Sequence, residues 1–242
     1  MVAYFEVVRG VLEAAEKRNA EALEAGAEAL AQCLGQGGVL HTFGTGHGHM
    51  LAEELFYRAG CLVAVNAILD PALMLHVSAL SSTHLERLPG YAGLVLERYR
   101  VKAGDVMMIA SNSGRNSVPI EMALAAKERG LTVIALTSMA HSQSQSSRHP
   151  SGKRLFELAD VVLDNCGVVG DAALTVDGLP GAIGATSTVV GAALLHALVH
   201  ATVVKMLARG TPPEITVSAN VDGGDAHNAA LFERYADRLR HL

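Results

Sequence analysis

The sequence predicts an α/β fold, a three-layer α/β/α sandwich with a five-stranded parallel sheet in the flavodoxin-like strand order 2-1-3-4-5. Apolar runs alternate with helix-forming segments along the chain, which is typical of parallel sheets with right-handed crossovers. Residues 106–110 are five apolar residues in succession, as expected for a strand covered on both faces. The chain has 242 residues, of which 50% are hydrophobic, so it can bury a sizeable core without disulfides.

The predicted elements begin with a helix over residues 3–33, which are rich in alanine, glutamate and leucine and end at a cluster of glycines. Helices are also expected at residues 50–58 and 118–127, the second with Pro119 in its first turn, where proline is tolerated. The five strands are expected at residues 38–43, 62–66, 105–110, 131–137 and 160–163.

The most apolar segment, residues 183–207, contains His196, His200 and Lys205 together with many small residues. We interpret it as a buried helix rather than a membrane span. It is apolar around most of its circumference, and the N-terminal helix adds a second apolar stripe. One domain offers little room to cover both surfaces, so a homodimer is expected.

Composition excludes several classes of function. The formal net charge of −5 implies no basic face for nucleic acid. The three cysteines, Cys33, Cys61 and Cys166, form no close pair, which favours a reduced, cytoplasmic setting and argues against a zinc framework. The N-terminus mixes charges throughout and has no basic-then-apolar leader. We therefore expect a small-molecule ligand, with neither nucleic acid nor a membrane as partner.

The turn after the third predicted strand has the chemistry of an anion site. Ser111, Asn112, Ser113 and Gly114 lie between that strand and the helix over residues 118–127. Free amides and the positive end of the helix dipole meet there, and two hydroxyls can also donate. A turn with hydroxyls but no lysine suits the phosphate monoester of a small molecule better than it suits a nucleoside triphosphate whose phosphate is cleaved. The alternative is a capping turn whose serines satisfy backbone groups.

A second glycine-containing turn follows the first predicted strand, at residues 44–49 (Gly-Thr-Gly-His-Gly-His). It lacks the third glycine at the spacing of a dinucleotide-binding turn, and the strand at 62–66 ends without the acidic residue expected for a ribose. A nicotinamide site is therefore disfavoured, and we predict no cofactor. Because the two turns follow the first and third strands, they flank the point where the strand order reverses. We therefore expect both turns to line the same ligand-binding crevice.

Together the two turns resemble those of the sugar isomerase (SIS) domain family, in which a G-x-G turn and an S-x-S-G turn bind a phosphosugar. The resemblance covers roughly residues 35–200 and suggests phosphoheptose isomerase-like and N-acetylmuramic acid 6-phosphate etherase-like members. Residues 147–153 and 86–91 are similar to a poorly characterised subgroup labelled as phosphosugar isomerases. The resemblance implies that the phosphosugar is bound by Gly44, Thr45, Gly46, His47, Ser111, Asn112, Ser113, Gly114, Arg115, Asn116 and Ser117.

The chain departs from the family pattern at two positions. Position 48 is glycine where many relatives have serine, and Asn116 replaces the usual threonine or serine, for which Ser117 can substitute. We divide the single predicted SIS domain, residues 1–242, into an N-terminal helix (1–35), a phosphosugar-binding core (36–208) and a C-terminal tail (209–242). The polar residues 141–147 are expected to form a mobile loop over the pocket.

Two carboxylates are candidates for a general base. Phosphosugar isomerases and eliminating lyases both remove the C–H proton next to a carbonyl, which requires a carboxylate or an imidazole. Glu86 lies in a connection of roughly forty residues between the second and third strands, and long connections are usually functional. The resemblance places Glu54 near an acidic residue of phosphoheptose isomerases, while a helix-surface or dimer-contact role remains its alternative. We weight Glu86 above Glu54.

Two histidines, His49 and His200, are further catalytic candidates. His49 lies in the first turn, four residues before Glu53, and such a pair can also bind a metal. Phosphoheptose isomerases carry zinc, but here the histidine is displaced by one position from the family's register, so we predict no metal. His200 shares a face of the apolar helix with His196, and relatives often direct a histidine from this helix into the active site, sometimes a neighbour's. A core or interface role is the alternative.

Three functions remain open at this point. The first is a lyase or dehydratase that acts on an amino-hexose or N-acetylamino-hexose 6-phosphate by proton abstraction and elimination. The second is an aldose–ketose phosphosugar isomerase that uses the same base and returns the proton to the neighbouring carbon. The third is a non-catalytic phosphosugar sensor, which would need a partner protein because the sequence has no helix-turn-helix reader.

Overall fold

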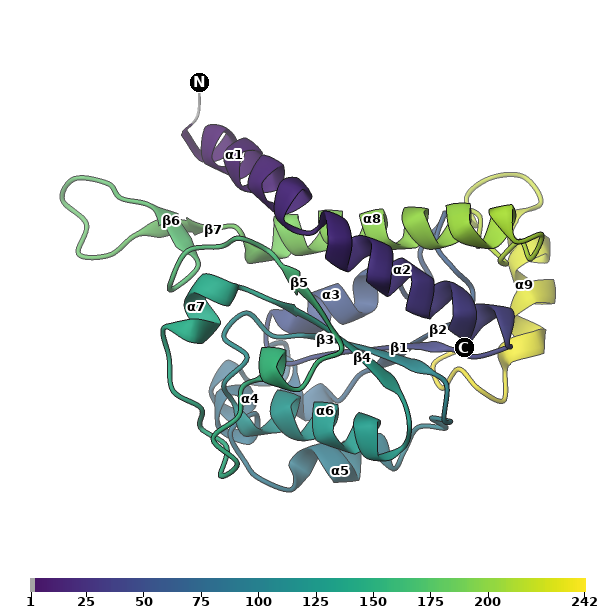
Figure 1. Ribbon diagram of the computed structural model, residues 1–242, viewed down its shortest axis with the longest axis horizontal. Helices are drawn as coiled ribbons and strands as arrows, with labels where there is room; N and C mark the ends of the chain where they lie inside the picture. The colour runs from purple at the N-terminus through teal and green to yellow at the C-terminus, as the bar shows by residue number, and fades with distance from the viewer. Residues whose placement is uncertain (1–2) are drawn as a thin grey trace.

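Five parallel strands form the central sheet in the order β2-β1-β3-β4-β5, which confirms the predicted fold class and strand order. The computed structural model describes residues 3–242 (Figure 1). The strands are β1 (Leu40–Gly44), β2 (Val65–Ile68), β3 (Val106–Ala110), β4 (Thr132–Thr137) and β5 (Val161–Asp164). The register pairs Gly44 with Ala110 and Ala110 with Leu136, so β1, β3 and β4 end at the same edge of the sheet.

Helices cover both faces of this sheet (Figure 1). One layer holds α1 (Ala3–Arg18), α2 (Ala20–Gly35), α3 (Gly48–Glu54) and α8 (Ser187–Ala208), and the other holds α4 (Ala79–Leu85), α5 (Tyr91–Leu96) and α6 (Ser117–Glu128). Alternate residues of β3 face the two layers: Met108 packs in the core beneath α2 and α8, while Met107 and Ile109 pack beneath α5 and α6. This two-sided burial explains the uninterrupted apolar run.

The N-terminal segment forms two helices rather than the one predicted over residues 3–33. The break occurs at Asn19, whose buried side chain hydrogen-bonds both the end of α1 and the sheet. Its Nδ2 donates to the carbonyl oxygens of Ala15 (2.6 Å) and Asp164 (2.8 Å), and its Oδ1 accepts from the Asp164 amide (2.7 Å). The junction is thereby fixed to the end of β5. Residues 1 and 2 lie outside the described range.

Helix α8 packs against α2 and also contacts α1 and α3. The segment was predicted to be a buried helix, but it is buried on one face only. Val204 and Leu207 remain 51% and 56% exposed. Among residues 3–242, α8 is the one helix that is long and apolar enough to cross a bilayer by length and composition.

Three segments differ from the sequence prediction. The hairpin of β6 (Ala172–Leu174) and β7 (Ile183–Ala185) projects from the body beside α1 (Figure 1). Helix α9 (Gly224–Tyr235) lies within the predicted tail, and α7 (Met139–Gln143) forms where a mobile loop was expected to begin. Helix α7 begins there because the Ser138 hydroxyl caps it, accepting from the His141 amide (3.1 Å). Two short 3-10 turns, η1 (Pro71–Leu73) and η2 (Leu155–Glu157), complete the chain.

The chain after α9 returns to the amino-terminal end of the sheet, where Asp105 precedes β3. Arg238 donates to both carboxylate oxygens of Asp105 (3.0 and 2.7 Å), and His41 Nε2 donates at 3.1 Å. Burial alone would raise the pKa of Asp105, but hydrogen bonds from His41 and from the amides of Lys102 and Val39 lower it to about 2. This carboxylate therefore stays ionised inside the fold.

Candidate functional site

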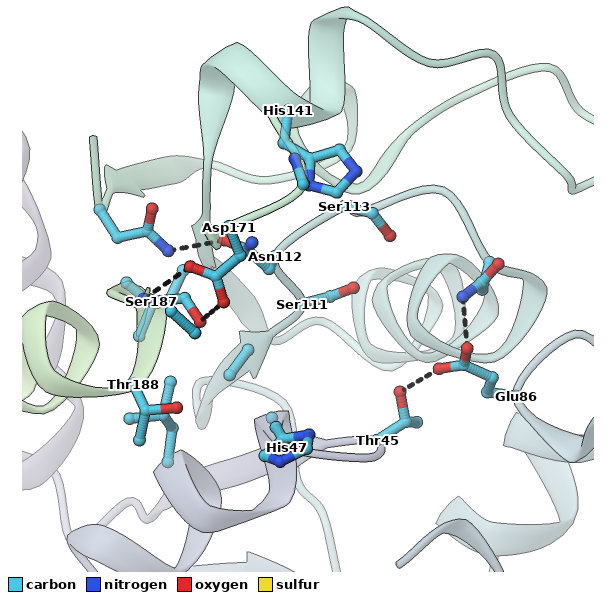
Figure 2. Close-up of a pocket in the computed structure, with 18 of the residues that line it drawn as sticks. Thr45, His47, Glu86, Ser111, Asn112, Ser113, His141, Asp171, Ser187 and Thr188 are labelled. Atoms are coloured by element: carbon cyan, nitrogen blue, oxygen red, sulfur yellow. Dashed lines mark hydrogen bonds between the residues drawn. The ribbon is translucent and has the colours of Figure 1, made fainter. Parts of the chain in front are cut away.

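A pocket of about 410 Å³ opens at the carboxyl ends of β1, β3 and β4, the edge at which a parallel α/β sheet binds ligands. The turns after β1 and β3 both reach it (Figure 2). The predicted residues that line it are Thr45, His47, Glu86, Ser111, Asn112, Ser113 and Asn116. The structure thus brings the two predicted turns and one of the two candidate carboxylates to one cavity.

The turn between β3 and α6 holds its hydroxyls at the pocket. Gly114 adopts a left-handed backbone (φ +57°), and its amide donates to Ser111 Oγ at 3.2 Å. The Ser113 hydroxyl and the amides of residues 113 and 115–117 have no acceptor in the part of the chain that the structure describes. Free donors at the first turn of a twelve-residue helix have the chemistry that suits an anion.

Ser111 satisfies one backbone amide, as the alternative interpretation expected, but no side chain caps the N-terminus of α6 itself. Asn116 is the N-cap residue of α6, yet its side chain makes no capping hydrogen bond. Its amide nitrogen instead donates to Glu86 Oε1 at 2.7 Å, and its oxygen accepts from Arg148 at 2.9 Å. The side chain is thus directed toward a carboxylate of the pocket rather than toward its own helix.

The turn after β1 is packed so tightly that two of its glycines are required. A Cβ on Gly44 would lie 2.2 Å from the Gly48 carbonyl oxygen, and a Cβ on Gly48 would lie 2.5 Å from the Ala110 carbonyl oxygen. The serine that many relatives carry at position 48 therefore cannot fit this backbone. Gly46 adopts a left-handed φ of +56°. The turn lies against the end of β3, and this contact brings Thr45 and His47 to the pocket.

Glu86 joins the two turns. Its Oε2 accepts from Thr45 Oγ1 (2.8 Å) in the first turn, and its Oε1 accepts from Asn116 in the second. Its backbone oxygen accepts from the Val118 amide (3.0 Å) in the first turn of α6. Burial raises the pKa of the Glu86 carboxyl, although the Thr45 hydrogen bond and the charges of Arg87 and Arg148 oppose that rise. A carboxylate of this kind is suited to take up a proton.

Glu54, the other candidate carboxylate, does not line this pocket. It ends α3 and accepts a hydrogen bond from His196 Nε2 (3.0 Å), with Arg58 3.5 Å away. His200, on α8, is exposed. His49 hydrogen-bonds the Gly46 carbonyl through Nδ1 (2.5 Å), and its Nε2 lies 3.8 Å from Glu53. Neither histidine lines the pocket within one copy of the chain.

Two residues of the predicted phosphate turn are also directed elsewhere. The Arg115 guanidinium donates to the Ser146 carbonyl (2.8 Å) and to Gln145 Oε1 (3.0 Å), so it fixes the loop after α7. The Ser117 hydroxyl is fully buried and has no hydrogen-bond partner within residues 3–242. Its amide, rather than its hydroxyl, is the group available to an anion.

The wall away from Glu86 was missed by the sequence prediction (Figure 2). Asp171 adopts an unusual left-handed backbone (φ +70°), accepts from the Thr186 and Ser187 amides (3.0 and 2.9 Å), and accepts from Ser187 Oγ (2.5 Å). Asn165 donates to Asn112 Oδ1 at 2.8 Å. Asn165 directly follows β5, and that position could have indicated it. Asp171 carries no such signal, because its partners come after an unpredicted hairpin.

His141 completes the lining above Ser113 (Figure 2). Burial lowers the pKa of His141, while the charge of Asp171 opposes that shift. Its Nδ1 accepts from the Gly170 amide at 3.4 Å, which leaves Nε2 to carry the proton of the neutral ring. Among residues 3–242, no three histidine, cysteine, aspartate or glutamate side chains are grouped to hold a metal.

Comparison with known proteins assigns the family. A family profile described as SIS domain matches residues 3–138. A UPF0309 protein of Shouchella clausii is 43% identical over 240 residues, covering 99% of this chain and 98% of its own. A UPF0309 protein of Caldanaerobacter subterraneus is 43% identical over 242 residues, with the same coverage. The chain belongs to the SIS-domain family, which confirms the resemblance predicted from the two turns.

Solved structures share the fold at low sequence identity. Phosphoheptose isomerase of Neisseria gonorrhoeae matches with a TM-score of 0.54 at 22% identity, covering 83% of this chain and 95% of that one. The sugar isomerase domain of an RpiR transcription factor from Sphaerobacter thermophilus matches with a TM-score of 0.51 at 17% identity, covering 98% of both chains. An enzyme and a regulator are thus both built on this fold.

Proposed function

We propose that this protein is an enzyme that binds a phosphosugar in the pocket and removes the proton next to the sugar carbonyl with Glu86. The observation that carries this proposal is the placement of Glu86: a half-buried carboxylate with a raised pKa that contacts both predicted ligand-binding turns. A carboxylate held against a phosphate site lies within reach of a small ligand bound there. A general base works best with a pKa moved toward neutrality.

The phosphate is proposed to bind at residues 111–117, where hydroxyls and free amides meet the start of α6. The sugar then extends between Glu86 and the wall formed by Asp171, Ser187 and Thr188 (Figure 2). Hydroxyl and carboxylate groups on that wall suit the hydroxyls of a sugar, and the cavity of about 410 Å³ has the size of a small-molecule site.

The reaction begins from the open-chain sugar. Glu86 takes the C2 proton, and the electron pair of the C–H bond moves to the carbonyl to give an enediolate, or an enolate when C2 bears nitrogen. For an N-acetylamino-hexose 6-phosphate, that electron pair then expels the substituent at C3, which is the elimination we favour. His141 lies on another side of the pocket from Glu86, where a neutral imidazole can donate a proton to the departing oxygen (Figure 2).

Isomerisation is the second candidate. It uses the same base and returns the proton to C1, and the phosphoheptose isomerase of Neisseria gonorrhoeae shares this fold. A non-catalytic phosphosugar sensor is the third candidate, and it is supported by the RpiR transcription factor domain, which shares this fold. The half-buried Glu86 carboxylate with its raised pKa favours catalysis over sensing, because ligand binding alone does not require a base.

The test is a panel of hexose and N-acetylhexosamine 6-phosphates, with products followed by mass. A loss of the C3 substituent indicates elimination, an unchanged mass with a shifted carbonyl indicates isomerisation, and binding without change indicates a sensor. For the base, we expect Glu86→Gln to lower exchange of the C2 hydrogen with deuterated solvent by about 10²–10⁴-fold while binding survives.

Glu54→Gln is the matched control, since it makes the same change outside the pocket and should exchange at nearly the wild-type rate. The pH profile provides a second readout. Because burial raises the pKa of Glu86, the rate should fall as pH drops through a value above 4.5, the ordinary value for glutamate. Wild-type exchange in Glu86→Gln would exclude this carboxylate as the base, and loss in Glu54→Gln alone would move the chemistry to that residue.

A further inference from the structure

Behind Glu86 lies an arginine to which neither the sequence motifs nor the proposed chemistry assigns a role. Arg148 follows α7 in the loop that ends at η2, and its NH1 donates to Asn116 Oδ1 at 2.9 Å. Asn116 Nδ2 in turn donates to Glu86 Oε1 at 2.7 Å. Since a guanidinium can only donate and an ionised carboxylate can only accept, these two partners allow the Asn116 amide a single orientation.

The backbone strengthens this chain of contacts. The Arg148 amide donates to the Arg115 carbonyl at 2.8 Å, so the loop is fixed to the turn that precedes α6. Asn116 is 7% exposed and does not cap its helix, so its side chain is committed to the link between Arg148 and Glu86. Thr45 holds the other oxygen of Glu86 at 2.8 Å. With one donor on each oxygen, the carboxylate cannot rotate freely.

We propose that Arg148 is a positioning residue, which orients the Asn116 amide and thereby fixes the Glu86 carboxylate in the plane that faces the ligand. The effect of this orientation on catalysis rests on the proposed function, whereas the orientation of the Asn116 amide by Arg148 is independent of it. Without Arg148 the Asn116 amide can turn over and present its oxygen to Glu86, which repels the carboxylate. A base displaced by about 1 Å reacts about 10²-fold more slowly, so Arg148→Gln should lower the exchange rate by about 10- to 100-fold.

Arg87 provides a matched control. It follows Glu86 directly in the chain, and its charge lowers the pKa of Glu86 as that of Arg148 does. It makes no hydrogen bond to Asn116 in the described chain. Arg87→Gln and Arg148→Gln therefore remove the same charge, and both should raise the pKa of Glu86 further. Only Arg148→Gln also removes the guanidinium that orients the Asn116 side-chain amide.

The orientation can be tested without any substrate, by NMR of the uniformly labelled protein. The side-chain amide signal of Asn116 should shift with pH as Glu86 titrates, because its N–H groups donate to that carboxylate. We expect Arg87→Gln to keep this coupled shift and Arg148→Gln to abolish it, with Arg148→Lys restoring part of it. An Asn116 signal that titrates alike in wild type and Arg148→Gln would overturn the inference.

The catalytic consequence is measured as deuterium exchange at C2 of the sugar phosphate, at a pH above the Glu86 titration. Arg148→Gln should be slower than Arg87→Gln with binding retained, and in an Asn116→Ala background it should add little, because both changes break the same chain. Equal rates for the two arginine variants would overturn the positioning role while leaving Glu86 as the base. If Glu86→Gln itself exchanged normally, the proposed function would fail, and the NMR result would still decide the orientation.

Discussion

The Ser113 hydroxyl offers the sharpest test of where the phosphate binds. It lines the pocket, and it forms no hydrogen bond to the rest of residues 3–242. Ser113→Ala should therefore leave the protein's own hydrogen bonds intact and remove one donor from the ligand. Ser111→Ala is less clean, because Ser111 Oγ also accepts from the Gly114 amide and helps to shape the turn.

The expected loss is that of one charge-assisted hydrogen bond, about 1.5–3 kcal/mol, since the free amides at 113 and 115–117 still hold the anion. This corresponds to a dissociation constant raised about 10- to 150-fold. Calorimetric titration with a hexose 6-phosphate and with the unphosphorylated hexose gives the comparison. The affinity for the unphosphorylated sugar should not change, and Ser81→Ala, an exposed serine outside the pocket, serves as the control.

Equal affinity of wild type and Ser113→Ala for the phosphosugar would refute the assignment of the phosphate to this turn. A parallel loss for both sugars would refute it in another way, because the hydroxyl would then contact the sugar rather than the phosphate. The titration with the unphosphorylated sugar distinguishes contact of the Ser113 hydroxyl with the sugar from contact with the phosphate.

Two predictions concern stability and assembly. The lowered pKa of Asp105, about 2 against 3.8, corresponds to about 2 kcal/mol of stability that is present above pH 3.8 and lost as pH falls toward 2. Asp105→Asn should remove this pH dependence and destabilise the fold in urea titrations at pH 7; an unchanged midpoint would contradict it. The exposed apolar face of α8 predicts a homodimer, which Leu207→Glu should weaken in sedimentation experiments. A wild-type monomer at micromolar concentration would exclude it.

The centre of the sheet was predictable because β3 and β4 are buried on both faces and carry uninterrupted apolar runs at residues 106–110 and 133–136. The helix break was not, because Asn19 is one polar residue within a helical pattern, and only its contact with Asp164 explains the break. The hairpin β6–β7 was missed for a related reason. Its strands have three residues each and are at most half-buried, so they show no alternation of apolar and polar residues.

Some residues of the candidate site could likewise be predicted from the sequence, and others could not. Its turns were predictable because glycine and serine at strand ends have local causes, such as the close approach of Gly48 to Ala110. Glu86 was selected by the length of its connection alone. Asp171 and Arg148 were not selected, because their importance depends on contacts across 15 to 32 residues of intervening chain. Such contacts leave no periodicity in the sequence.

The fold separates the groups that stabilise it from those that face the ligand. Asp105 precedes β3 and joins the C-terminal segment to the amino ends of the strands, while Ser111 follows β3 and faces the pocket. Five residues of extended chain span about 17 Å, beyond the distance at which independent sites usually influence each other. A variant of Glu86, Asn116 or Arg148 that loses activity while keeping its free energy of unfolding has therefore lost the base or its geometry at the pocket and not the fold that carries it.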